Sequence, residues 1–401
     1  MEQIPLNIQY QESFCKEDAT RTILFGDNAT DSPKFLEQIL GQKIQTVMVV
    51  FTKGSERARK VAETIKLRLA KNDASNKLTF YLFGGAWPQV PEDYVEAAVL
   101  EYNRLGQPDS ILTVGGGSAV GLGKAICLRC TGGEESQEPL PYLMSVVTTY
   151  SGSEMTDLQG ISRKDGSGKQ VFQSSRMVVK LVVYDPGLLN TLPDNVTVPS
   201  VFNAMAHAVE VLWGQNLDEE TRKVAKEAIR MICLNITDYV GGNSEVRGKA
   251  RSKLLYGAYL CGHALGAGVE LGIHHKLAHV LGGLIKLPHA QAHCVLLPYS
   301  IAYNRAHCDR AMSDLVEVLS EITFTGGNVS DPATTIFNLQ RGVGAPCSLK
   351  DIGMQEYQIG SAVEASMHEG YSNPRPYEKR AIRKLYEMAF NGEKPDISSK
   401  Y

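Results

Sequence analysis

The sequence lacks the two features that would place a chain at or across a membrane. None of its apolar runs approaches the roughly 20 residues that an α-helix needs to span a bilayer. The N-terminal segment does not show the basic and then apolar order of a signal peptide. We therefore expect an intracellular, cytoplasmic protein with no membrane partner.

The chain also has little excess charge and few residues of unusual type. It carries 41 Lys and Arg against 44 Asp and Glu, a formal net charge of −3, which gives no electrostatic reason to expect nucleic acid as a partner. Its 401 residues, 43% of them hydrophobic, suffice for two or three domains. Cys127 and Cys130 form a CxxC motif within an expected helix, which favours a structural role over a redox or zinc pair.

Strand-like and helical patterns alternate in the first half of the chain. Apolar runs of strand length occur at residues 46–51, 78–83, 110–114, 142–148 and 178–184. Helical spacing of apolar residues occurs at 57–71 and 91–105. This alternation predicts a parallel sheet with helices on its faces.

Beyond residue 197 the patterns become helical. We expect helices at residues 201–213, 219–240, 250–267, 273–283, 311–324 and 380–390. The sequence therefore predicts an α/β nucleotide-binding domain at 1–197 and an all-α catalytic domain at 198–401. A cleft between them is the expected site of a small-molecule substrate.

A glycine-rich turn joins the strand expected at 110–114 to a helix expected at 119–130. The turn is Gly115-Gly116-Gly117-Ser118. Glycines let a pyrophosphate approach the backbone, and the helix start holds its negative charge with N–H groups and the helix dipole. Three glycines alone fit a plain tight turn as well, but the passage from strand to helix favours a cofactor site.

A second polar turn, residues 148–154, also follows an expected strand. It contains Thr148, Thr149 and Ser153. Ligands bind at the C-terminal ends of parallel strands in open α/β sheets, although this loop read alone is equally consistent with a hydrogen-bonded turn.

Seven of the nine histidines lie between residues 207 and 293. His275 and His279 are four residues apart on an expected helix and share a face, as do Asn203 and His207. His289 follows a proline in an expected loop. Imidazoles brought together in this way suit zinc or iron, and they also suit proton transfer near neutral pH.

The sequence gives less reason to assign a function to the other histidines. His263, His307 and His368 are better explained as ordinary core or surface residues, whereas His274 and His293 remain undecided between a structural and a functional role.

These blocks resemble, in order and spacing, the iron-containing alcohol dehydrogenase superfamily. The segments that carry the resemblance are the GGGS turn, the 148–154 loop, Asn203-Ala-Met-Ala-His207 and HHKLAHVLGGLIKLPHAQAH at 274–293. Typical alcohol dehydrogenases carry aspartate at the positions of Gly121 and Asn203, and both departures resemble the maleylacetate reductase branch. Residues 87–91 and Tyr299 differ from that branch and leave the exact substrate open.

The resemblance implies a dehydroquinate synthase-like, iron-type alcohol dehydrogenase fold, a homodimer, and NADH or NADPH as cofactor. It implies reduction of 2-maleylacetate to 3-oxoadipate in the breakdown of aromatic compounds. The expected cofactor contacts are Thr52, Lys53, Gly115, Gly116, Gly117, Ser118, Thr148, Thr149, Ser153 and Lys169. Lys53 occupies the place of an aspartate in NAD-specific relatives, so NADPH should be accepted at least as well as NADH, although a solvated surface lysine fits this position equally well.

By position, Asn203, His207, His275 and His289 match the metal-ligand places of the dehydrogenases, and His279 matches the histidine near the nicotinamide. We expect His279 and His275 to act on the developing enolate, with His207 and His289 positioning the substrate or holding a metal. Asn203 lacks the charge of an aspartate, so any iron or zinc should bind weakly. The alternatives are a metal-dependent alcohol dehydrogenase and a non-redox, ligand-binding relative.

Overall fold

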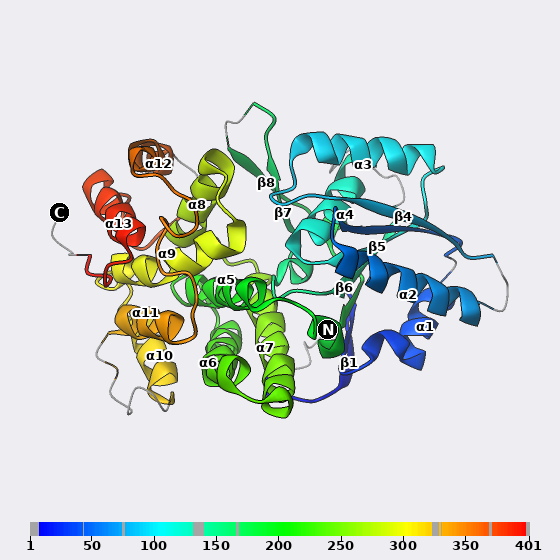
Figure 1. The fold of residues 1–401 in the computed structure, drawn as a ribbon, viewed down its shortest axis with the longest axis horizontal. Coiled ribbons are helices and arrows are strands. Elements are labelled where there is room, and N and C mark those ends of the chain that lie inside the picture. Colours follow the sequence, from blue (N-terminus) through cyan, green and yellow to red (C-terminus); the bar gives the residue numbers. More distant parts are fainter. Residues whose placement is uncertain are drawn as a thin grey trace.

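The computed structural model describes residues 8–42, 44–73, 77–130, 140–165, 168–322, 329, 331–368 and 371–397. An α/β half and a helical half lie side by side, with the α/β half on the right in Figure 1. This arrangement agrees with the predicted fold class.

A seven-stranded sheet forms the centre of the α/β half, in the order β1-β2-β9-β6-β5-β3-β4. All pairings are parallel except that of β1 with β2. The strands are β1 (Phe14–Glu17), β2 (Thr22–Phe25), β3 (Thr46–Thr52), β4 (Thr79–Ala86), β5 (Ser110–Gly115), β6 (Tyr142–Val147) and β9 (Leu181–Tyr184). All five strands predicted from the apolar runs are present, whereas β1 and β2 are too short to give a pattern.

Side chains of successive strand residues point to opposite faces of the sheet. Val47 and Val49 of β3 pack in one buried cluster with α2, while Met48 and Val50 pack in another with α4. The helices of this half are α1 (Pro33–Leu40), α2 (Glu56–Asn72), α3 (Glu92–Arg104) and α4 (Gly117–Cys130). Helices therefore cover both faces of the sheet, as expected for parallel strands that are apolar throughout.

An antiparallel hairpin, β7 (Leu158–Ser162) with β8 (Lys169–Gln173), stands apart from the main sheet. It lies at the top of Figure 1, where the two halves meet. The sequence did not predict it, because its two strands are short and only partly apolar.

The helical half is built around α5 (Asp194–Leu212), which is buried from Thr197 to its end. The other helices are α6 (Glu219–Gly241), α7 (Ser244–Leu265), α8 (Ile273–Val280), α9 (His289–Asn304), α10 (Asp309–Ser320), α11 (Pro332–Gly342), α12 (Ile359–Met367) and α13 (Lys379–Asn391). A π-helical turn, η5 (Leu281–Ile285), continues α8. All six predicted helices are present, and the last two residues of the one expected at 311–324 lie outside the described residues.

The prediction of a loop at His289 was wrong. His289 is the first residue of α9, and Pro288 takes the N-cap position, where a missing N–H costs nothing. Pro298 inside α9 weakened the helical pattern of this segment. The correction matters because it places His289 and His293 one turn apart on the same helix.

The predicted domain boundary falls inside a helix. The last strand of the sheet ends at Tyr184, and α5 begins at Asp194, so residues 197 and 198 lie near the start of α5. The N-terminal segment also contacts the helical half, since Tyr10 donates its hydroxyl proton to Ser252 of α7 at 2.8 Å. The division into two domains at this residue stays a prediction.

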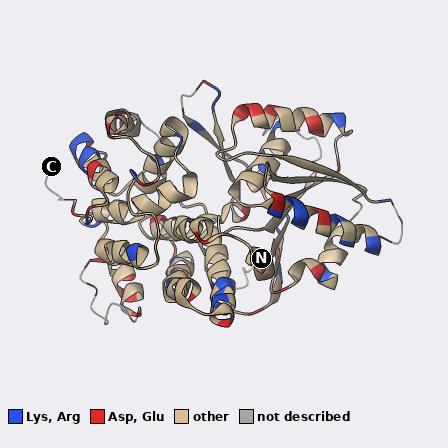
Figure 2. Ribbon diagram, viewed as in Figure 1, with Lys and Arg blue, Asp and Glu red and all other residues tan. Residues whose placement is uncertain are grey.

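Charged side chains of both signs are interspersed on outer helices such as α2 and α3 (Figure 2). Among the described residues, no helix combines the length and the apolar character needed to cross a bilayer. The mixed signs on these helices agree with the balanced charge of the sequence.

Candidate active site

A cavity of about 540 Å³ is lined by residues of both halves. Most of the residues singled out from the sequence lie in its wall, and these are Thr52, Gly116, Gly117, Ser118, Thr149, Ser153, Lys169, Asn203, His207, His275, His279 and His289. The glycine turn and these histidines, which lie about 90 to 170 residues apart in sequence, therefore face one common space.

Three predicted cofactor residues are not part of this wall. Lys53 is exposed, and its ammonium group lies over the rings of Trp87 and Tyr94, at 5.7 and 5.0 Å from their centroids. Thr148 is buried, and its hydroxyl and carbonyl oxygens accept hydrogen bonds from Arg57 at 3.3 and 3.1 Å. Gly115, the third, is the last residue of β5. Thr148 is thus occupied in holding the base of the loop, and it is Thr149 that faces the cavity.

The three glycines of the turn differ in how much space a side chain would have at each position. A Cβ atom on Gly115 would lie 2.7 Å from the Cβ of Ala119, and one on Gly116 would overlap the hydroxyl of Thr149. A Cβ on Gly117 would meet nothing closer than 3.5 Å. Packing within the protein therefore requires the first two glycines, whereas Gly117 opens onto the cavity at the N-terminus of α4, where an anion is favoured.

A buried lysine that sequence reasoning missed holds the polar loop after β6. The ammonium group of Lys124 donates to the carbonyl oxygens of Ser153, Thr156 and Leu158 at 2.6, 2.7 and 3.0 Å. These three residues line the cavity. Lys124 is the one charged residue within the apolar stretch 117–128 of α4. A single charge inside an apolar helix is the feature of the sequence that could have identified it.

Six histidines form a continuous cluster beside the cavity. The ring centroids of His207 and His275 lie 5.0 Å apart, those of His275 and His293 4.7 Å, and those of His289 and His293 4.3 Å. His274 lies 4.8 Å from His293, and His279 lies 5.8 Å from His275. His274 and His293, left undecided by the sequence, thus belong to the same cluster.

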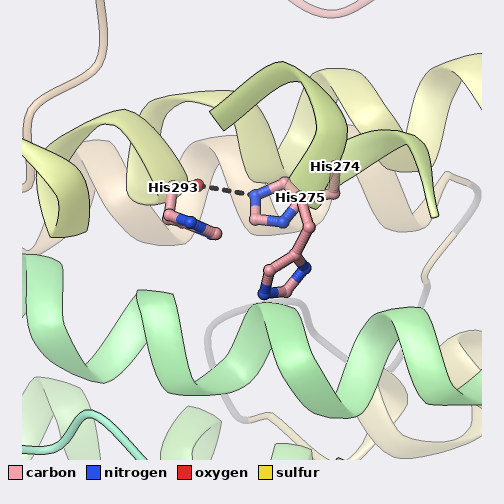
Figure 3. Close-up of side chains that lie close together, drawn as sticks. All are labelled: His274, His275 and His293. Atoms are coloured by element: carbon pink, nitrogen blue, oxygen red, sulfur yellow. Dashed lines mark hydrogen bonds between the residues drawn. The ribbon is translucent and has the colours of Figure 1, made fainter. Parts of the chain in front are cut away.

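Glu210 orients one face of this cluster. Its carboxylate accepts a hydrogen bond from Nδ1 of His275 and a second from the backbone N–H of His274, the latter at 2.8 Å. Figure 3 shows the His275 ring turned away from those of His274 and His293, towards the helix that lies below them. Because Nδ1 of His275 donates to the Glu210 carboxylate, a neutral His275 carries its proton on Nδ1. Its free lone pair is then on Nε2.

Tyr371 fixes His279 in a similar way. Its hydroxyl lies 2.6 Å from Nδ1 of His279. Burial raises the pKa of Tyr371 to about 12, so the phenol keeps its proton and can donate it to Nδ1. The imidazole then carries its own proton on Nε2 and becomes a hydrogen-bond donor. Nothing in the sequence linked Tyr371 to His279, because 92 residues separate them.

Burial keeps the imidazoles of the cluster neutral. Desolvation lowers the pKa of His275 to about 3 and that of His274 to about 4. It also lowers the pKa well below the usual value for His207, His279, His289 and His293. Lys169 contributes to this effect at His275, His279 and His289, because an ammonium group nearby disfavours a second positive charge. At neutral pH these side chains act as dipoles and hydrogen-bonding groups.

The predicted ligands His207, His275 and His289 do not bring their ligand atoms within 4.8 Å of one another. Oδ1 of Asn203 and Nδ1 of His207 and of His289 are nevertheless buried without a hydrogen-bond partner among the described residues, so a bound metal stays a prediction. Among the described residues, only His274, His275 and His293 bring ligand atoms within 4.8 Å of one another. The rings of His207 and His275 are stacked, with 22° between their planes. Asn203 offers a neutral oxygen, and the nearby carboxylate of Glu210 is already taken by His275 and the backbone. We therefore derive no chemical step through a metal.

Family models match almost the whole chain. Residues 20–186 match the family described as iron-containing alcohol dehydrogenase. Residues 197–390 match the C-terminal part of the Fe-containing alcohol dehydrogenase family. The chain therefore belongs to the iron-containing alcohol dehydrogenase family and is an oxidoreductase.

Within this family of oxidoreductases, the chain is similar to several maleylacetate reductases. The chain is 40% identical to a maleylacetate reductase of Burkholderia cepacia over 78% of its own length and 83% of that protein. It is 35% identical to a maleylacetate reductase of Pseudomonas sp. strain P51 over 96% of its length and 99% of that protein. The crystal structure of maleylacetate reductase from Agrobacterium tumefaciens superposes with a TM-score of 0.78 at 30% identity, covering 96% of this chain and all of that one.

Proposed function

We propose that the protein reduces 2-maleylacetate, or a similarly small unsaturated oxo-dicarboxylate, with NADH or NADPH. The observation that carries this proposal is the single cavity in which the glycine turn faces the histidine cluster. Its relatives named maleylacetate reductase, which match nearly the full chain, support the choice of substrate.

The α/β half of the cavity supplies the cofactor site in this proposal. Gly117 and Ser118 at the start of α4 are suited to the pyrophosphate, because backbone N–H groups and the helix dipole meet there. Thr52, Thr149 and Ser153 offer hydroxyl groups beside it. When bound, the nicotinamide cofactor supplies the hydride.

His279 is the proposed proton donor. Adding hydride to a carbon–carbon double bond conjugated with a keto group leaves negative charge on the keto oxygen. An Nε2–H group on His279 can donate to this oxygen and then transfer its proton, which gives an enol. The enol becomes the ketone when the neighbouring carbon takes a proton from water and the oxygen releases its own. As the proton leaves His279, the hydroxyl proton of Tyr371 moves to Nδ1, and water restores the phenol. The hydrogen bond between Tyr371 and His279 makes this relay possible.

His275 is proposed to take the complementary role. With Nδ1–H donated to Glu210, its Nε2 can only accept a hydrogen bond. Such an acceptor orients a protic group of the substrate, or a water molecule, beside His279. His207, Asn203 and His289 complete the wall and position the remaining substrate oxygens.

The experiment that tests the proposal is consumption of NADH and NADPH with maleylacetate and with a panel of simple ketones. Turnover of maleylacetate that persists after treatment with a chelator supports a metal-free reductase. Turnover confined to the ketones, and lost with the chelator, would instead identify a metal-dependent alcohol dehydrogenase. The homodimer, the cytoplasmic location and the preference between the two cofactors stay predictions.

A further inference from the structure

The loop between β4 and α3 has an unusual backbone. Gln89 and Val90 are consecutive residues with positive φ angles, 65° and 48°. This conformation is uncommon for any residue except glycine, and it is an outlier for a β-branched valine. Strain of this kind persists only where surrounding structure enforces it, and it gathers at functional sites. Gln89 and Val90 both line the cavity.

Contacts with the hairpin hold the loop in this shape. Ser162, at the end of β7, donates its backbone N–H to the carbonyl of Val90 at 3.1 Å and its hydroxyl to the carbonyl of Gln89 at 3.0 Å. The N–H of Val90 closes a turn onto Trp87 at 3.1 Å. The Gln89 side chain is therefore presented to the cavity from a fixed backbone.

Of the two polar atoms of the Gln89 amide, Oε1 has a hydrogen-bond partner and Nε2 has none among the described residues. Its Oε1 accepts a hydrogen bond from the ammonium group of Lys169 at 3.5 Å, which orients the amide with Nε2 on the other side. Nε2 is buried and has no hydrogen-bond partner among the described residues. A buried donor without a partner costs free energy, and a ligand that accepts its hydrogen bond removes that cost.

Nε2 of Gln89 lies beside the turn that continues the helix carrying His275 and His279. A Cβ atom on Gly282 would lie 2.5 Å from Nε2, so the amide rests against the turn η5 that continues α8. Gly282 follows His279 by three residues, about one helical turn. Gln89, Lys169 and His279 all line the cavity, and the charge of Lys169 contributes to the lowered pKa of His279.

We propose that Gln89 is a specificity-determining residue, whose Nε2 donates a hydrogen bond to a carboxylate of the substrate. The proposal rests on the proposed function, because it assigns one end of an oxo-dicarboxylate to the Gln89 and Lys169 side of the cavity. The keto group then lies towards His279. The same donor also suits the carboxamide oxygen of a nicotinamide, and the experiment separates these two ligands.

The experiment compares maleylacetate with its two monomethyl esters, in which one carboxylate at a time loses its charge. The variants are Gln89→Glu, which keeps the shape of the side chain and replaces the donor by an anion, and Gln89→Gly, which removes the side chain and tolerates the positive φ. The matched control is Gln170→Glu, which adds the same charge to the exposed neighbour of Lys169 on β8. Steady-state kcat and KM are measured for each substrate and for the cofactor.

For Gln89→Gly we expect the preference for the diacid over one ester to fall about tenfold, equivalent to ~1.4 kcal/mol, with the KM of the cofactor unchanged. Gln89→Glu should lower this preference further, whereas Gln170→Glu should leave it intact. An unchanged preference in both Gln89 variants, or a change in cofactor KM alone, would overturn the assignment. A wild-type protein that does not reduce maleylacetate would instead overturn the proposed function.

Discussion

Gly121 on α4 and Val90 in the loop before α3 pack so closely that a Cβ atom on residue 121 would lie 2.9 Å from Cγ2 of Val90. The same atom would lie 2.7 Å from Oε1 of Gln159. The aspartate that the resemblance to typical alcohol dehydrogenases leads one to expect here would force Val90 or Gln159 to shift. The strained loop that presents Gln89 and the glycine at 121 therefore depend on each other.

Gly121→Ala should destabilise the protein by about 1–3 kcal/mol, because overpacking forces well-packed neighbours to shift. The matched control is Gly360→Ala in α12, where a Cβ atom would meet nothing within 4 Å and alanine should be neutral or slightly stabilising. Urea unfolding of the two variants provides the measurement. Equal stabilities would show that the contact between Val90 and Gly121 relaxes freely.

Gly117→Val should weaken cofactor binding by at least about tenfold, or ~1.4 kcal/mol, while the free energy of unfolding changes little. The physical reason is that an added side chain fits without collision, since its Cβ meets nothing closer than 3.5 Å, but it takes up cavity space proposed for the pyrophosphate. Gly116→Val should lower both stability and binding, since its side chain also collides with Thr149. Fluorescence titration with NADPH separates the two effects, and unaltered affinity in a folded Gly117→Val protein would refute the site.

Tyr371→Phe should lower kcat about tenfold and leave the cofactor affinity unchanged, because it removes the hydroxyl that orients His279. His279→Ala should lower kcat by ~10²–10⁴-fold, the usual loss for a general acid. Tyr357→Phe is the control, since Tyr357 is 82% exposed. If Tyr371→Phe retained full activity, the proton relay through His279 would be wrong.

The catalytic efficiency should depend on pH through Lys169. Burial lowers the pKa of Lys169 to about 8, so the ammonium group is charged at neutral pH and loses its proton as the pH rises through about 8. Attraction for anionic ligands is lost in the same interval, and kcat/KM for maleylacetate should fall there. Lys169→Arg should abolish this fall, because a guanidinium stays charged, whereas Lys169→Met should be poor at every pH. A wild-type profile with no change near pH 8 would contradict this assignment.

The sequence predicted the parts of the fold that repeat a pattern. Five strands and eight helices followed from the periodicity of apolar residues, whereas α9 was missed because Pro298 interrupts it and because Pro288 marks its start as a loop. The hairpin of β7 and β8 was missed because neither strand is long or apolar enough to give a signal.

For the candidate site, residue types and spacing brought the glycine turn and the histidines into consideration. The residues that contact them could not be predicted from the sequence. Tyr371, Glu210 and Gln89 act through contacts between segments that are far apart in the chain. The cofactor contact expected for Lys53 stays a prediction, and the structure places its ammonium group over the rings of Trp87 and Tyr94.

The most direct test of the account follows one reaction to its product. Purified protein is incubated with maleylacetate and NADH or NADPH, with and without a chelator, and the product is identified by mass spectrometry and NMR while bound metal is measured by elemental analysis. We expect one 3-oxoadipate formed for each reduced cofactor consumed, at an unchanged rate after chelation and with little metal bound. Reduction of the keto group to an alcohol, dependent on about one metal ion per chain, would contradict the account.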